Sequence, residues 1–135
     1  MKIAICGSCD FVEEMKKAKD YLESKGIEVF AHEPLVTERW YAEKHGRDKL
    51  LEMKPVFTQN HFRKIEKSDA VLIINKEKKG HKGYFGSNTL MELSVAFFLG
   101  KKIFLLNPIE ESHPHFEEIA KIGAITLNND LSKIG

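Results

Sequence analysis

The sequence predicts an α/β fold: a doubly wound, mostly parallel five-stranded sheet with helices on both faces, Rossmann-like and with flavodoxin-like strand order. Short apolar stretches alternate along the chain with segments of helical periodicity, which is typical of parallel strands joined by right-handed crossovers. The most apolar stretches lie in the middle of the chain, as expected for central strands covered on both faces. With 135 residues, the chain has room for one domain, residues 1–135.

The first half of the chain begins with a βαβ unit. Residues 3–6 are a short apolar run that predicts the first strand, and residues 11–26 predict a helix because apolar side chains recur there at helical spacing: Phe11, Met15, Ala18 and Leu22. Residues 27–31 predict the second strand, and His32 opens the loop that follows it. Residues 37–67 are rich in charged residues and helix formers, and Pro55 predicts a break between two helices there.

The second half continues the alternation of strands and helices. The predicted elements are strand 70–74, helix 89–99, strand 102–106, helix 116–121 and strand 124–127. In a sheet of this kind, ligands bind at the carboxyl edge, where the strand order reverses. That edge is expected to contain Gly7, Ser8, His32, Glu33, residues 76–89 and Asn107.

Composition and charge exclude several classes of partner. Lys and Arg number 21 against 20 Asp and Glu, so the net charge of +1 gives no field that would favour nucleic acid or an anionic membrane. Apolar runs such as residues 95–99 are far shorter than the roughly 20 residues that cross a bilayer. The N-terminus lacks the features of a signal peptide. We therefore expect a cytoplasmic protein whose two cysteines are free thiols.

Gly7 and Ser8 lie in the first predicted strand-to-helix turn. Backbone N–H groups and the positive end of the helix would face a phosphate or a hydroxylated ligand there, although an ordinary tight turn explains the pair equally well. The chain has neither GxGxxG nor GxxxxGK[ST], which disfavours dinucleotide oxidoreduction and P-loop NTP hydrolysis.

Residues 83–100 contain the most informative pattern. Glycines and polar residues, among them Gly86, Ser87 and Asn88, precede a helix in whose first turn Glu92 is expected, surrounded by apolar residues. A carboxylate in such a place is costly unless it has a function, such as that of a nucleophile. The alternative is a capping box, in which Glu92 returns a hydrogen bond to the amide of an N-cap Thr89.

Other motifs give weaker alternatives. Cys6 and Cys9 form a CxxC at a strand end, where a thiol redox motif could lie, although Cys6 is expected to be buried. His113 and His115 do not have the spacing of a structural zinc site, so no metal is expected. The lysines of residues 76–82 could attract an anionic ligand to the strand edge, but they are interpreted as a solvated charge run.

Three segments together resemble the nucleoside 2-deoxyribosyltransferase superfamily, which includes the deoxyribonucleoside 5'-monophosphate N-hydrolases. They are CGS at residues 6–8, KSDAVLIIN at 67–75 and GSNTLMELSVAFFLGKKIFLL at 86–106. The resemblance implies that Glu92 is the nucleophile, and that Gly7 and Ser8 contact the sugar or phosphate. Gly86, Ser87 and Asn88 would form a second cradle. His32 and Asn107 are expected as further substrate contacts because of their predicted place at the carboxyl edge.

The resemblance also implies N-glycosidic cleavage of, or deoxyribosyl transfer from, a nucleoside or nucleoside 5'-monophosphate, with no cofactor. Family members are often homodimers or higher homo-oligomers. Where the family commonly carries an aspartate before the third strand, eight residues before Asp69, this chain has His61. Histidine can donate a proton near neutral pH, so His61 is expected to assist the leaving base. The same replacement supports an alternative, a non-catalytic nucleotide-binding sensor of this fold.

Overall fold

Five strands form one parallel sheet in the order β2-β1-β3-β4-β5. The computed structural model describes residues 1–78 and 80–134. The strands are β1 (Lys2–Gly7), β2 (Glu28–Phe30), β3 (Ala70–Ile74), β4 (Lys102–Leu105) and β5 (Ile125–Thr126). This arrangement confirms the predicted α/β fold and its flavodoxin-like strand order.

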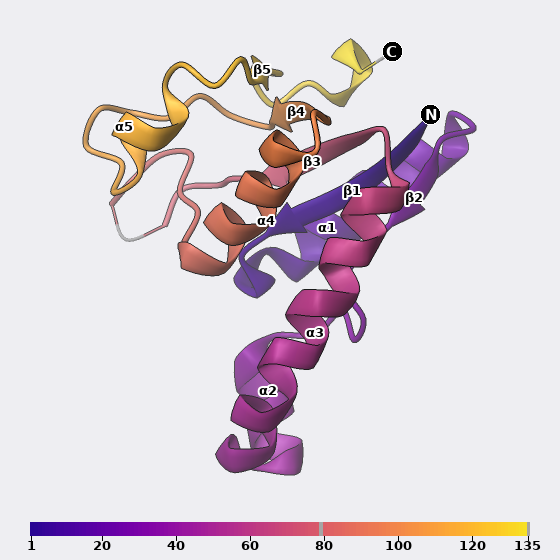
Figure 1. The fold of residues 1–135 in the computed structure, drawn as a ribbon, viewed down its shortest axis with the longest axis vertical. Helices are drawn as coiled ribbons and strands as arrows, with labels where there is room; N and C mark the ends of the chain where they lie inside the picture. The colour runs from indigo at the N-terminus through magenta and orange to yellow at the C-terminus, as the bar shows by residue number, and fades with distance from the viewer. Residues whose placement is uncertain (79, 135) are drawn as a thin grey trace.

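Helices cover both faces of the sheet (Figure 1). They are α1 (Val12–Ser24), α2 (Glu38–His45), α3 (Arg47–Lys67), α4 (Ser87–Phe98) and α5 (Phe116–Ile119), with 3-10 turns η1 (Cys9–Phe11) and η2 (Leu131–Lys133). Apolar side chains of α1 pack on one face of the sheet, and those of α3, α4 and α5 pack on the other. The far ends of α2 and α3 extend together away from the sheet (Figure 1). No helix in residues 1–78 and 80–134 is long and apolar enough to cross a membrane.

β3 lies at the centre of the sheet, between β1 and β4. Its five residues are at most 1% exposed because helices cover both faces, which explains why the strand is a continuous apolar run without alternation. Burial of each Val, Leu or Ile side chain of this strand stabilises the fold by about 1.5–3 kcal/mol.

The prediction of a helix break at Pro55 is wrong. α3 continues through Pro55, and the break between α2 and α3 falls at Gly46, whose φ of +92° suits glycine. Proline removes one helical hydrogen bond, but Pro55 lies on an exposed side of α3, where water can satisfy the carbonyl group of Leu51.

Two buried contacts shape the carboxyl edge of the sheet. Gly83 has a φ of +68°, and a Cβ atom there would lie 2.2 Å from the carbonyl oxygen of Pro108, so only glycine fits. The Asn75 side chain donates to the carbonyl oxygens of Gly83 and Asn107 at 3.2 and 2.7 Å, and accepts from the Asn107 amide at 2.9 Å. These contacts hold the loop after β3 against the loop after β4.

Candidate active site

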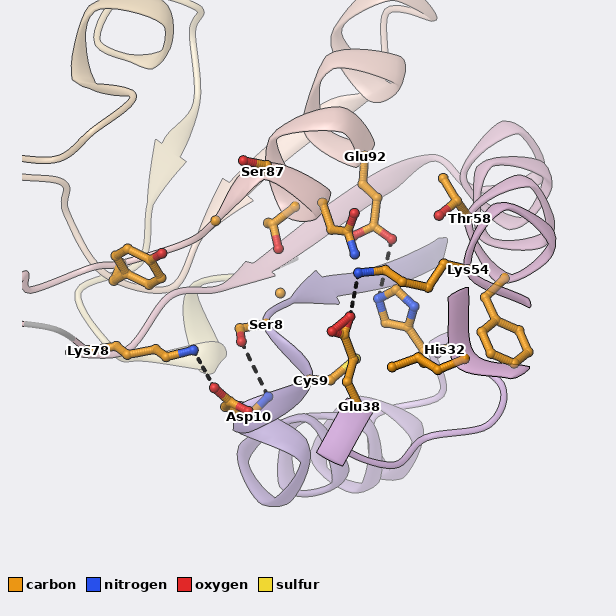
Figure 2. Close-up of a pocket in the computed structure, with 17 residues that line it drawn as sticks. Ser8, Cys9, Asp10, His32, Glu38, Lys54, Thr58, Lys78, Ser87 and Glu92 are labelled. Carbon is orange, nitrogen blue, oxygen red and sulfur yellow. Dashed lines mark hydrogen bonds and ion pairs between the residues drawn. The ribbon is translucent and has the colours of Figure 1, made fainter. Parts of the chain in front are cut away.

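A cavity of about 360 Å³ lies at the carboxyl edge of the sheet, where β1 and β3 send their chains to opposite faces. Its walls come from the turn after β1, the end of β2, the helices α2 and α3, and the loop that leads into α4 (Figure 2). The lining residues are Gly7, Ser8, Cys9, Asp10, His32, Glu38, Leu50, Lys54, Phe57, Thr58, Lys78, Tyr84, Gly86, Ser87, Asn88, Thr89 and Glu92. The site therefore lies where a doubly wound fold binds its ligands.

Most of the residues selected from the sequence meet at this cavity. The structure brings together Glu92 and six predicted binding residues: Gly7, Ser8, His32, Gly86, Ser87 and Asn88. It does not bring Asn107 or His61 to the cavity wall. The side-chain amide of Asn107 instead donates to the backbone oxygen of Asn75 at 3.0 Å, which ties two loops together.

Glu92 is almost completely buried, with 3% of its surface exposed. The capping-box interpretation is wrong, because α4 begins at Ser87 after an N-cap at Gly86, which places Thr89 inside the helix and Glu92 beyond its first turn. Glu92 Oε1 has no hydrogen-bond partner among the described residues. A buried carboxylate oxygen that borders a cavity and has no partner is a candidate for contact with a ligand.

His32 is the neighbour of Glu92 on the cavity wall. Its Nε2 lies 3.3 Å from Glu92 Oε2, close enough for an ion pair when the imidazole is protonated, although the contact lacks hydrogen-bond geometry. Figure 2 shows the two side chains meeting from α4 and from the loop after β2. The carboxylate thus has an imidazole beside it and no fixed hydrogen bond to restrain Oε1.

His61 lies behind His32. The two rings stack with centroids 3.8 Å apart and an interplanar angle of 13°. His61 Nε2 lies 2.9 Å from the carbonyl oxygen of Ile5, and since a carbonyl only accepts, this nitrogen carries the proton. Burial, with smaller contributions from the charges of His32 and Lys64, lowers the pKa of His61 to about 2. The ring is therefore neutral near pH 7.

The neutral state of His61 predicts a loss of stability in mild acid. The unfolded chain takes up a proton below the ordinary histidine pKa of 6.5, whereas folded His61 does not until about pH 2, so stability present above pH 6.5 falls as the pH drops through this window. Between pH 7 and pH 5 this group contributes a loss of about 2 kcal/mol in the free energy of unfolding. Urea denaturation at both values measures it, and the loss in His61→Asn should be smaller by that amount. Equal losses in the two proteins would contradict the assignment.

The cysteines lack the features of a redox pair. Burial and the nearby Glu92 raise the pKa of Cys6 well above its ordinary value. Burial, followed by the negative charges of Glu38, Glu92 and Asp10, raises the pKa of Cys9 to about 11. Thiol redox chemistry needs a lowered pKa, so these environments argue against that alternative.

Cys9 is expected to react slowly with alkylating reagents. At pH 8 a pKa of about 11 leaves about 100-fold less thiolate than the ordinary value of 9.0. The greater nucleophilicity of the more basic thiolate offsets part of this, so alkylation by iodoacetamide should be about tenfold slower than for a free cysteine peptide. Mass spectrometry of a Cys6→Ser protein, in which Cys9 is the remaining thiol, measures the rate. Labelling faster than the peptide would show an activated thiolate.

One cluster of side chains has the donor types of a metal site. Ligand atoms of Cys6, His61 and Glu92 lie within 4.8 Å of one another. Two of the three would first have to lose a proton, because Cys6 is held as a thiol and His61 Nε2 donates to Ile5. The donor set therefore fits a metal ion poorly.

Two ion pairs on the cavity wall were missed by the sequence analysis. Lys54 Nζ of α3 lies 2.6 Å from Glu38 Oε1 of α2. Lys78, which was expected to be only solvated, pairs with Asp10 and lines the cavity. The helical spacing does indicate that Lys54 lies on the same side of α3 as His61, because residues 54, 57, 58 and 61 share one face of this helix.

Fold and cavity together define a doubly wound α/β protein with a small-ligand site at the carboxyl edge of its sheet. No protein-family model matches the sequence, and no curated protein is a significant sequence match. Solved structures share the fold, and two of them follow.

One is a 2-deoxyribosyltransferase from Bacillus psychrosaccharolyticus, with a TM-score of 0.58 and 20% identity over 82% of this chain and 75% of that chain. The other is the CMP N-glycosidase BcmB of Clostridium botulinum, with a TM-score of 0.53 and 16% identity over 93% of this chain and 85% of that chain. At these identities the likeness establishes the fold.

Proposed function

We propose that this protein breaks the N-glycosidic bond of a nucleoside or nucleoside 5'-monophosphate and passes the deoxyribosyl group to water or to a second base. The observation that carries the proposal is Glu92, buried beside the cavity with Oε1 unpartnered among the described residues. The two proteins of the same fold support it, since one is named for deoxyribosyl transfer and the other for N-glycosidic cleavage of CMP.

The sugar and any phosphate would occupy the end of the cavity at the start of α4. No side chain in the described part of the chain caps this helix, so its first N–H groups are available to ligand oxygens. Ser87 and Asn88 add polar side chains, and Gly7 and Ser8 face them from the turn after β1. Ser8 also caps η1 by accepting from the Asp10 amide at 3.3 Å, so it serves the turn as well. These groups position the sugar for reaction.

In the first step, a Glu92 carboxylate oxygen forms a bond to C1' of the sugar as the bond from C1' to the base nitrogen breaks. The electron pair of the broken bond leaves with the base, which takes a proton. The transition state resembles an oxocarbenium ion, which the negative carboxylate stabilises. Water, or the nitrogen of a second base, then attacks C1' and gives up a proton to the group that protonated the first base. The electron pair of the bond from C1' to Glu92 returns to the carboxylate, which is released. No step requires a cofactor.

We assign the proton transfer to His32 and a positioning role to His61. His32 lines the cavity beside Glu92, and imidazole exchanges protons near neutral pH. His61, the donor expected from the sequence, is neutral and has its N–H engaged by Ile5. It can orient His32 through the stacked rings, and thereby Glu92.

Chromatographic detection of free base tests the proposal. The purified protein is incubated with the common deoxynucleosides and their 5'-monophosphates, and we expect at least one to release its base. Binding without release would favour the alternative, a non-catalytic nucleotide sensor, for which the replacement of the family aspartate by His61 is the motivating observation. Absence of both binding and release would exclude both functions.

The expected homodimer or higher oligomer stays a prediction. It is supported by exposed apolar side chains on α4, where Met91, Phe97 and Phe98 are 47%, 55% and 87% exposed. Light scattering coupled to size exclusion measures the mass of the particle, and a monomer at micromolar concentration would contradict it.

A further inference from the structure

The cavity has two chemically different ends, with Glu92 between them. Ser8, Ser87, Asp10 and Lys78 lie toward one end, and His32, Glu38, Lys54 and Thr58 toward the other (Figure 2). The first end has the hydroxyl and N–H groups that suit a sugar and phosphate. The second end, formed by α2 and α3, has no role in the bond-breaking step apart from His32.

The second end has an apolar part of its wall. Phe57 and the buried Leu50 line it. The Phe57 ring is held edge to face against Tyr41 of α2, with ring centroids 5.5 Å apart and planes at 83°. A fixed aromatic ring that borders a cavity provides a stacking surface for a planar ligand, and every nucleobase has such a face.

A cation and an anion lie beside this wall. The ion pair of Lys54 and Glu38 joins two helices, with side chains 36% and 46% exposed. Ion pairs this accessible contribute little stability, so a ligand can replace the contact at small cost. The Glu38 carboxylate only accepts hydrogen bonds, and the Lys54 ammonium only donates them. Together they complement a ligand edge on which a hydrogen-bond donor is next to an acceptor. The hydrogen-bonding edges of the common bases have this arrangement.

We propose that Glu38, Lys54 and Phe57 bind the nucleobase, with the base stacked on Phe57 while Glu38 accepts from its N–H group and Lys54 donates to its adjacent acceptor. This assignment rests on the proposed function and specifies which part of the substrate each end of the cavity holds. A base held there leaves C1' facing Glu92 and the sugar oxygens facing the start of α4.

Calorimetric binding to a Glu92→Gln protein, which lacks the proposed nucleophile, tests the assignment. The probes are the four common deoxynucleosides and their 5'-monophosphates, and 2-deoxyribose 5-phosphate as a ligand without a base. Glu38→Ala and Lys54→Met should each raise the Kd of every nucleoside or nucleotide that binds by at least tenfold. The Kd of the sugar phosphate should change less than twofold. Glu43→Ala, which breaks a comparable exposed ion pair with Arg39 on α2, is the matched control and should change neither.

Equal weakening of nucleotide and sugar phosphate would show that the pair only ties α2 to α3, and would overturn the assignment. Unchanged nucleotide binding would overturn it as well, while the proposed function would stand. If none of the probes binds even to the protein with its native Glu38 and Lys54, the proposed function fails and the assignment fails with it. Circular dichroism and thermal melting of each variant establish that the fold is retained.

Discussion

Replacing Glu92 with glutamine should lower the rate of base release by roughly 10⁴-fold, because the amide can neither attack C1' nor neutralise an oxocarbenium ion. The amide has nearly the same shape, so it fits the buried space that the carboxylate occupies. Since Oε1 has no hydrogen-bond partner among the described residues, the substitution also breaks no hydrogen bond at that atom. Initial rates from chromatography, together with thermal melting, measure activity and fold separately.

Two further variants make this result specific. Glu92→Asp keeps the negative charge, but its side chain is one methylene group shorter, so the carboxylate lies farther from C1'. This variant should retain more activity than Glu92→Gln and much less than the native protein. Glu43→Gln, an exposed glutamate on α2, should have native activity. A Glu92→Gln protein that releases base at the native rate would leave the proposed reaction without its nucleophile.

The fold was predictable because two strong patterns agree in this chain. β3 and β4 are short, largely apolar runs, which in a parallel sheet belong at the centre. The charged helices with one apolar face, α1 and α3, come directly before β2 and β3. Helix boundaries were less predictable, because each depends on a balance between small local contributions to the free energy of folding. Proline at position 55 is tolerated because α3 exposes it, whereas Gly46 ends α2 through its positive φ.

The site was predictable where it depends on strand ends and not where it depends on helix packing. Gly7, Ser8 and His32 follow parallel strands, so the topology alone brings them to one edge. Glu38 and Lys54 come from two helices whose relative placement is set by tertiary contacts. The helical pattern shows which residues share a face of α3, but it does not show that Lys54 meets Glu38 of α2 at the cavity wall.

The role of His61 also depends on tertiary contacts that the sequence does not show. Its position before β3 was inferred from the motif, but its role depends on which backbone group it meets. The last paired residues of β1 and β2 are Ala4 and Phe30, so Ile5 lies one residue beyond the point where β2 ends, and His61 supplies a donor there. The sequence does not show that the Ile5 carbonyl group lies beyond the end of β2 and needs a donor. For this reason His61 was expected to be a proton donor, whereas in the structure it is a buried neutral ring.

Replacing His32 with asparagine should lower the turnover rate for natural nucleosides by roughly 100-fold, because the departing base then loses its proton donor. The loss should be much smaller for an aryl 2-deoxyriboside whose leaving group is stable as an anion, since such a group departs without a proton. The ratio of the two rates, natural nucleoside over aryl deoxyriboside, therefore reports the donor and should fall steeply in His32→Asn. His61→Asn, by contrast, should lower both rates by a similar factor, because loosening the stacked rings does not remove the donor. If the ratio is unchanged in His32→Asn and falls in His61→Asn, the donor is His61, and the ring behind the cavity wall must reach the base by a movement that its hydrogen bond to Ile5 opposes.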